Sequence, residues 1–233
     1  MTLGPTRLAR LPRMVPLLLT AVVLLTWSNL VVPTLPADGS VRAALNVAGA
    51  LGLLAVARGA GVTWHELGIG RHTWRAGLRW GGGALALIGC GYAVVLLVAP
   101  HVLANPQVAG SSLSAVLIRA LVLIPLGTVL AEEIAFRGVL HVPAVRVLPA
   151  RVALAVTSVT FGLWHVMTAL GPSAVAVPTA WRAAEVVGIV VFTALGGLLL
   201  GWLRHRTGSL LAPMGLHLGT NVVGLVAAVI ALH

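Results

Sequence analysis

Long apolar segments are the feature that most constrains what this chain can fold into. Seven of them, each about long enough to cross a bilayer as a helix, are separated by short stretches containing Arg, Pro or Gly. Backbone N–H and C=O groups in lipid need partners within the protein, which helices supply from their own segment. The chain is 59% hydrophobic and only 9% charged, unlike a soluble domain. We therefore predict an all-α, polytopic transmembrane helix bundle.

The predicted spans follow the apolar segments in order. They cover residues 14–32, 42–57, 80–99, 113–140, 152–170, 184–203 and 209–232. The first has the basic start of a signal peptide, but it is long enough to span and further spans follow, so we interpret it as a retained helix. We divide the chain into residues 1–109, with the first helices and a basic cytoplasmic loop, and residues 110–233, a helical core that carries the polar motifs.

The basic residues indicate how the bundle is oriented. All fifteen are Arg, and the formal net charge is +10. They fall mainly between apolar segments, which favours membrane orientation over nucleic-acid binding. With seven crossings, most of them fall on one side of the membrane, including Arg7, Arg10, Arg13, Arg58, Arg71, Arg75, Arg79, Arg146, Arg151, Arg204 and Arg206. We predict a multi-pass plasma-membrane protein with a cytoplasmic N-terminus, and the Lys-free, Arg-rich composition hints at a bacterial source.

Two of the five acidic residues are adjacent and lie inside an apolar segment. Glu132 and Glu133 fall within predicted span 113–140, where carboxylates are costly and usually functional. On a helix, Glu133 and Arg137 are four residues apart, with the acid first, which is the favourable orientation for an ion pair. Glu132 lies about 100° further round. We expect Arg137 to neutralise Glu133 while Glu132 points into a cavity.

Two later spans carry further polar residues at helical spacing. Phe161 and His165 share one helix face, and His217 and Asn221 share another. An isolated histidine in a membrane helix is often just a hydrogen bonder between helices. Together with the glutamates and Arg137, however, these side chains could supply a base, an oxyanion donor and a neutralising ion pair, as hydrolysis needs.

The order of these motifs resembles a known family. Glu-Glu-x-x-x-Arg, then Phe-x-x-x-His, then His-x-x-x-Asn on successive helices is similar to the CPBP family, the CAAX protease and bacteriocin-processing intramembrane endopeptidases, also called the Abi domain. The likeness covers about residues 110–230. The segment Glu66-Leu67-Gly68-Ile69 also resembles a short element that precedes the core of that family.

The resemblance implies a role for each matching residue. Glu132 and His165 would hold and activate a water that attacks a peptide carbonyl, and His217 and Asn221 would face the developing oxyanion. The supporting residues would be Glu133, Arg137 and Phe161. The implied activity is cleavage of a membrane-associated peptide or protein near the cytoplasmic face, with residues 110–233 as the catalytic core.

Metal dependence is left open by these residues. Glu132, His165 and His217 could bind zinc and leave a fourth position for water. No His-Glu-x-x-His zinc helix occurs, and the single cysteine, Cys90, cannot form a Cys-based site. We favour metal-independent activation of water by Glu132.

Two other function classes remain as alternatives. A non-catalytic immunity or scaffold protein could keep the same fold, and a proton-coupled transporter could use Glu132 and His165 as a relay. The lack of internal repeats weighs against a transporter.

The predicted spans place two of the proposed catalytic residues at different depths in the membrane. Glu132 would lie within a turn or two of the cytoplasmic face, whereas His165 would lie about 20 Å deep. His141, placed at a span end, is expected to be solvated.

Overall fold

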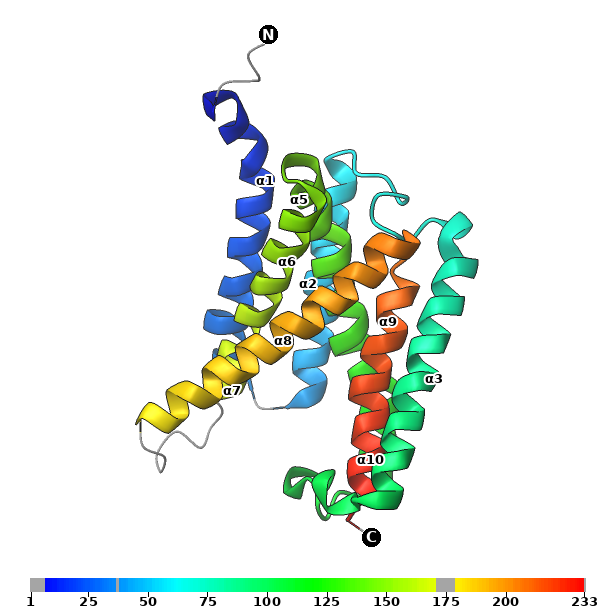
Figure 1. Ribbon diagram of the computed structural model, residues 1–233. Coiled ribbons are helices and arrows are strands. Elements are labelled where there is room, and N and C mark those ends of the chain that lie inside the picture. The colour runs from blue at the N-terminus through cyan, green and yellow to red at the C-terminus, as the bar shows by residue number, and fades with distance from the viewer. Residues whose placement is uncertain (1–6, 37, 171–178, 233) are drawn as a thin grey trace.

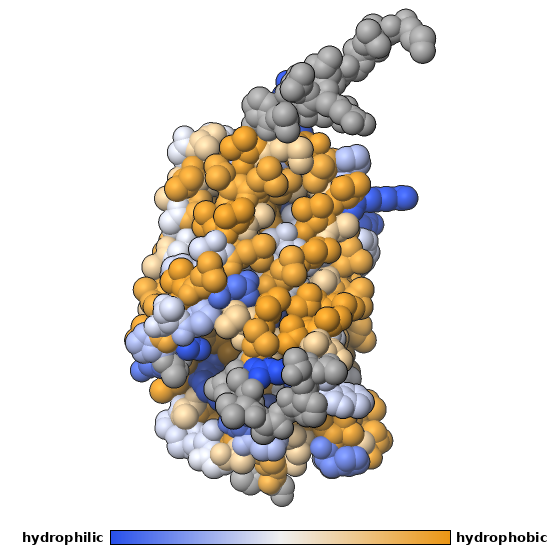
Figure 2. All heavy atoms as spheres, turned by 90° about the vertical axis from the view of Figure 1, so that its left-hand side faces the viewer, coloured by the Kyte–Doolittle hydropathy of each residue, from blue (hydrophilic) through white to orange (hydrophobic). Residues whose placement is uncertain are grey.

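The computed structural model describes residues 7–36, 38–170 and 179–232, and all regular structure in them is helical. Figure 1 shows a bundle of long, roughly aligned helices crossed by the oblique α8. Seven stretches are long and apolar enough to cross a membrane: Arg13–Thr34, Gly39–Gly59, Arg71–Val98, Leu113–Val147, Ala150–Leu170, Trp181–Thr207 and Leu211–Ile230. The face in Figure 2 is largely apolar, as a lipid-facing surface should be. The predicted all-α bundle and its number of spans are confirmed.

The spans are built from these elements: α1 (Arg7–Thr26), π-helix η1 (Trp27–Val31), α2 (Gly39–Gly59), α3 (Trp74–Val98), α4 (Leu113–Ile118), π-helix η6 (Arg119–Leu130), π-helix η7 (Glu133–Leu140), α5 (His141–Val147), α6 (Ala150–Trp164), α7 (Val166–Leu170), α8 (Thr179–Thr207), α9 (Leu211–Leu218), π-helix η8 (Gly219–Val223) and α10 (Gly224–Ile230). Short 3-10 turns at Val32–Thr34, Arg71–Thr73, Pro100–Val102 and Pro106–Val108 lie in the connections.

The fourth span is longer than predicted, and this removes the predicted difference in depth between Glu132 and His165. Its helix continues past residue 140 to Val147, because Val142 and Ala144 are buried in the core. Glu132 therefore lies about four turns from that helix end, and His165 lies about four turns from the start of α6 at Ala150. No unusual tilt is needed. The prediction that His141 is solvated is wrong, since its exposed fraction is 8%.

The helix that carries the glutamates is wound more widely than an α-helix over much of its length. The π-helical stretches η6 and η7 lie on either side of Ala131 and Glu132. Pro125 lies inside η6, where it can donate no backbone hydrogen bond. Departures from α-helical winding of this kind are frequent at functional sites.

Helices α3 and α9 approach so closely that their backbones touch. A Cβ atom at Gly215 would overlap the carbonyl of Gly81, and a Cβ at Gly81 would overlap the carbonyl of Leu211. Small residues allow this approach in lipid, where association relies on van der Waals packing. The contact holds α9, and with it His217, against the rest of the bundle.

We predict that Gly215→Ala destabilises the protein by about 1–3 kcal/mol, the usual cost of overpacking, because the added methyl group must push α3 and α9 apart. The unfolding midpoint of the detergent-solubilised chain measures the effect. Gly82→Ala is the control, since a Cβ there meets nothing within 4 Å. Equal midpoints for the two variants would contradict the backbone contact.

Candidate active site

The buried Glu133 carboxylate is the centre of the polar cluster. Its side chain is fully buried, and its Oε1 atom accepts hydrogen bonds from Arg137 Nη1 at 3.2 Å and His217 Nδ1 at 2.8 Å. Arg137 also donates to the carbonyl of Gly197 at 3.4 Å. Its guanidinium carbon lies 4.1 Å from the ring centroid of Phe161. One carboxylate oxygen therefore ties together the helix of the two glutamates and α9.

His217 faces both glutamates. Because the Glu133 carboxylate can only accept, we assign a hydrogen to Nδ1 of His217. The other ring nitrogen, Nε2, lies 3.8 Å from Glu132 Oε2. That separation is too long for a direct hydrogen bond, but a water beside the pair could bond to both atoms.

Each glutamate keeps one oxygen without a hydrogen-bond donor among the described residues. These atoms, Oε2 of Glu132 and Oε2 of Glu133, are both buried. A buried polar atom without a partner costs free energy, and such atoms often mark the place where a ligand binds. In Glu132 this oxygen is the one that faces His217.

The other oxygen of Glu132 binds Trp164, a residue that the sequence analysis missed. Trp164 Nε1 donates to Glu132 Oε1 at 3.3 Å, and the indole packs edge-on against Phe136 with 5.3 Å between ring centroids. The sequence feature that could have pointed to Trp164 is its position beside His165 inside a span, because tryptophan usually collects at the membrane interface. Trp164 holds the Glu132 side chain in one orientation.

His165 lies at a break between two helices. Helix α6 ends at Trp164 and α7 begins at Val166, and the break frees backbone groups that side chains of η1 then satisfy. Ser28 Oγ donates to the carbonyl of Trp164 at 2.7 Å, and Asn29 Nδ2 donates to the carbonyl of Leu163 at 3.1 Å. These two polar residues of the first span were also missed, although polar side chains within a span are a general signal of function.

The His165 ring is anchored through Phe161. Its Nδ1 lies 2.8 Å from the carbonyl oxygen of Phe161, so Nδ1 carries the hydrogen and Nε2 is left as an acceptor. The Phe161 ring also packs edge-on against His165 and His217, at centroid separations of 4.8 and 6.3 Å. The Phe161 ring therefore contacts both histidines.

Asn221 is placed differently from the other predicted site residues. Its Nδ2 donates to the backbone carbonyl of His217 at 3.1 Å, within the same helix. The side chain lines a separate, more polar pocket together with Tyr92, Asn105 and Thr220. Direct contacts therefore join Glu133, Arg137 and His217, Phe161 connects these to His165, and Asn221 reaches the cluster through a backbone carbonyl.

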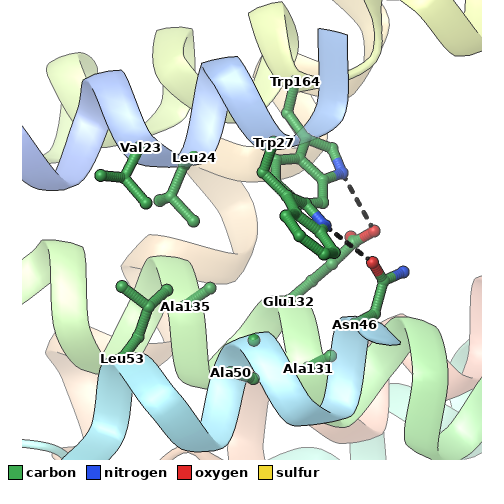
Figure 3. Close-up of a pocket in the computed structure, with 11 residues that line it drawn as sticks. Val23, Leu24, Trp27, Asn46, Ala50, Leu53, Ala131, Glu132, Ala135 and Trp164 are labelled. Carbon is green, nitrogen blue, oxygen red and sulfur yellow. Dashed lines mark hydrogen bonds between the residues drawn. The ribbon is translucent and has the colours of Figure 1, made fainter. Parts of the chain in front are cut away.

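Glu132 lines a small apolar pocket between α1, α2 and its own helix (Figure 3). The cavity measures about 80 Å³, enough for water molecules. Trp27 Nε1 donates to Asn46 Oδ1 at 2.9 Å at one end of the pocket, and Asn46 in turn donates to the carbonyl of Gly127 at 3.1 Å. The apolar lining is Val23, Leu24, Gly49, Ala50, Leu53, Ala131 and Ala135. The expectation that Glu132 points into a cavity is met by this geometry.

The loop between α2 and α3 docks beside the cluster. Leu67 is fully buried, and Arg204 donates through Nη2 to the Glu66 carbonyl at 2.7 Å and through Nε to the Arg137 carbonyl at 3.1 Å. Arg204 follows predicted span 184–203 in the sequence, but in the structure it belongs to α8 and its exposed fraction is only 6%. The Glu66 carboxylate faces outwards, where a hydrogen bond from Arg146, helped by Thr63, lowers its pKa to about 2. This loop thereby braces the backbone at Arg137.

The family comparison covers the helices that carry this cluster. The profile of the Rce1-like family, described as type II CAAX prenyl endopeptidase, matches residues 112–223. Residues 112–223 are therefore similar to this family. This segment spans just under half of the chain and includes every predicted site residue from Glu132 to Asn221. The resemblance to CAAX-type proteases is confirmed. No curated protein and no solved structure matches the chain.

The proposed zinc ligands of this Rce1-like segment do not converge on one point. Within the described residues, no group of three His, Cys, Asp or Glu side chains is placed to hold a metal ion. His217 Nε2 and Glu132 Oε2 face each other, but the contacts of the His165 ring are with Phe161. Two donors are fewer than the three protein ligands usual at a catalytic zinc.

We expect the purified protein to hold no stoichiometric zinc, because only two of the three candidate ligands face each other. Elemental analysis of protein prepared without chelator measures this. His217→Ala should leave the metal content unchanged. One zinc per chain in the wild type that is lost in both His217→Ala and Glu132→Gln would show that the two residues hold a metal.

Proposed function

We propose that the protein is an intramembrane endopeptidase that hydrolyses a peptide bond in a membrane-associated peptide or protein. The similarity of residues 112–223 to the Rce1-like family supports a CAAX-type endopeptidase in general. The observation that carries the finer proposal is the unpaired Oε2 of Glu132, 3.8 Å from His217 Nε2 and beside an apolar pocket.

In the proposed reaction, Glu132 is the general base. Its free Oε2 accepts a proton from the attacking water while Trp164 holds Oε1. His165 has its Nδ1 hydrogen engaged by the carbonyl of Phe161, which leaves Nε2 as an acceptor that can orient the same water. The water oxygen attacks the peptide carbonyl carbon, and the proton on Glu132 then passes to the departing amine.

The proposed oxyanion donor is His217, and Glu133 prepares it for that role. To donate from Nε2 as well as Nδ1, the ring must be an imidazolium, with N–H groups on both sides. Glu133, 2.8 Å from Nδ1, stabilises that positive charge. Two carboxylates, Arg137 and a protonated His217 would together be electrically neutral, as a cluster buried in a membrane requires. Asn221 holds the backbone of His217 from the next turn.

The pocket beside Glu132 is the proposed site for an apolar part of the substrate. Part of its wall comes from α1 and α2, helices outside the matched segment, and the lining is mainly aliphatic. An apolar side chain lodged there would hold the neighbouring peptide bond near the Glu132 carboxylate. Specificity for the substrate would therefore depend on the first two spans as well as on the motif helices.

We predict that Glu132→Gln lowers the rate of peptide cleavage by at least 10²-fold, because it removes the proposed base, and general bases contribute about 10²–10⁴-fold. The measurement is cleavage of lipid-embedded candidate peptides by the purified chain. Candidates come from products that disappear from the membrane proteome of cells carrying the variant. Glu185→Gln, on exposed α8 surface, is the control and should cleave like the wild type. Full activity in both Glu132→Gln and His165→Ala would rule out the mechanism.

We also predict that Gly49→Leu raises the KM at least several-fold, because its side chain would enter the pocket beside Glu132. A Cβ at Gly49 meets nothing within 4 Å, so the chain should still fold. Gly52→Leu, on the same helix, is equally free of contacts but lies outside the pocket lining, and its KM should be unchanged. Steady-state kinetics on the same peptide compares them. The pocket would have no part in substrate binding if both variants matched the wild type.

A further inference from the structure

A second hollow lies between α3 and α8, away from the glutamates. It measures about 650 Å³, and its walls are residues of α3 and α8, with Leu216 of α9 also lining it. In Figure 1 the start of α3 and the end of α8 lie close together at one end of the bundle, with α9 running between these helices. Neither Glu132 nor His165 lines this groove.

One end of the groove is cationic. Arg79 on α3 and Arg206 on α8 both line it, and both are exposed. The ion pairs of the described residues are those of Arg137, Arg146 and His217, so no described carboxylate neutralises either groove arginine. Two unneutralised positive charges on facing walls attract an anionic group between them.

Aromatic rings lie beside the arginines. Trp80 and Trp202 meet edge to face, with their centroids 5.7 Å apart, and the guanidinium of Arg206 lies 5.8 Å from the Trp80 ring centroid. Tryptophan collects at the boundary between headgroups and acyl chains. The charged end of the groove therefore lies at the level of the lipid headgroups.

The rest of the groove is apolar and open. From Arg79 to Leu87 the wall of α3 runs about 12 Å along the helix axis, and the Leu87 side chain is 73% exposed. A Cβ at Gly83 would meet nothing within 4 Å, so this glycine leaves space in the wall. The dimensions and polarity suit an acyl chain that enters the membrane below a headgroup.

We propose that this groove binds one anionic phospholipid, with its phosphate between Arg79 and Arg206 and an acyl chain along the wall at Gly83 and Leu87. Net positive charge at the mouth selects an anionic over a zwitterionic headgroup. A peptide is less suited to the groove, because its backbone would find few hydrogen-bond partners against the apolar wall. The inference does not rest on the proposed proteolytic activity.

The test uses the delipidated full-length chain in detergent. Phosphatidylglycerol and phosphatidylcholine with identical acyl chains are titrated while the thermal unfolding midpoint is followed. Phosphatidylglycerol should raise the midpoint, while phosphatidylcholine and inorganic phosphate should leave it in place. The double variant Arg79→Gln/Arg206→Gln should raise the apparent Kd for phosphatidylglycerol about tenfold or more, because each basic residue near an anionic lipid contributes appreciably to the free energy of binding.

Matched control variants distinguish lipid binding in the groove from attraction of the lipid by the overall positive charge of the protein. Arg75→Gln removes an exposed charge one turn earlier on α3, outside the groove, and should bind like the wild type. Gly83→Leu should block binding with all arginines intact, whereas Gly82→Leu, equally free of contacts, should not. Equal stabilisation by both lipids, or equal losses for Arg75→Gln and the double variant, would overturn the proposal. So would displacement of phosphatidylglycerol by a soluble acidic peptide.

Discussion

The Glu133 carboxylate, shared between Arg137 and His217, is the interaction on which the rest of the structure depends. It is fully buried, so its charge needs partners within the protein. Removing one partner from such a group usually costs about 3–5 kcal/mol, because an uncompensated charge remains in a medium of low dielectric constant. The two partners come from its own helix and from α9. The same bond therefore positions the His217 ring and joins the two helices.

The surrounding elements fix the position of the Glu133–His217 hydrogen bond relative to Glu132 and His165. Backbone contact between Gly81 and Gly215 sets the position of α9, and Arg204 braces the carbonyl of Arg137. The break at His165 is held by two side chains of the first span. Polar side chains outside the family motifs thus satisfy backbone groups that the motif helices leave open, which matters more in lipid than in water.

Sequence reasoning reached the motif residues but misjudged some of their surroundings. The i,i+4 spacing was enough to anticipate the pairing of Glu133 with Arg137, because that contact is local to one helix. The end of the fourth span was placed too early, because His141 and Arg146 read as the polar boundary of an apolar segment. Tertiary packing of Val142 and Ala144 extends the helix beyond them. In the same way α8 extends past the predicted end of its span at residue 203, and Arg204 is buried.

The sequence by itself determined that the chain forms a helical membrane bundle, how many spans it has, and which helices carry ionisable groups. These follow from segment length, hydropathy and the cost of charge in lipid. Only the tertiary structure decided that His217 bonds to Glu133 while facing Glu132, that Trp164 holds Glu132, and that Asn221 turns towards a different pocket. Those outcomes depend on the rotation and depth of one helix against another. Both are set by side-chain packing between distant segments, which no local pattern in the sequence encodes.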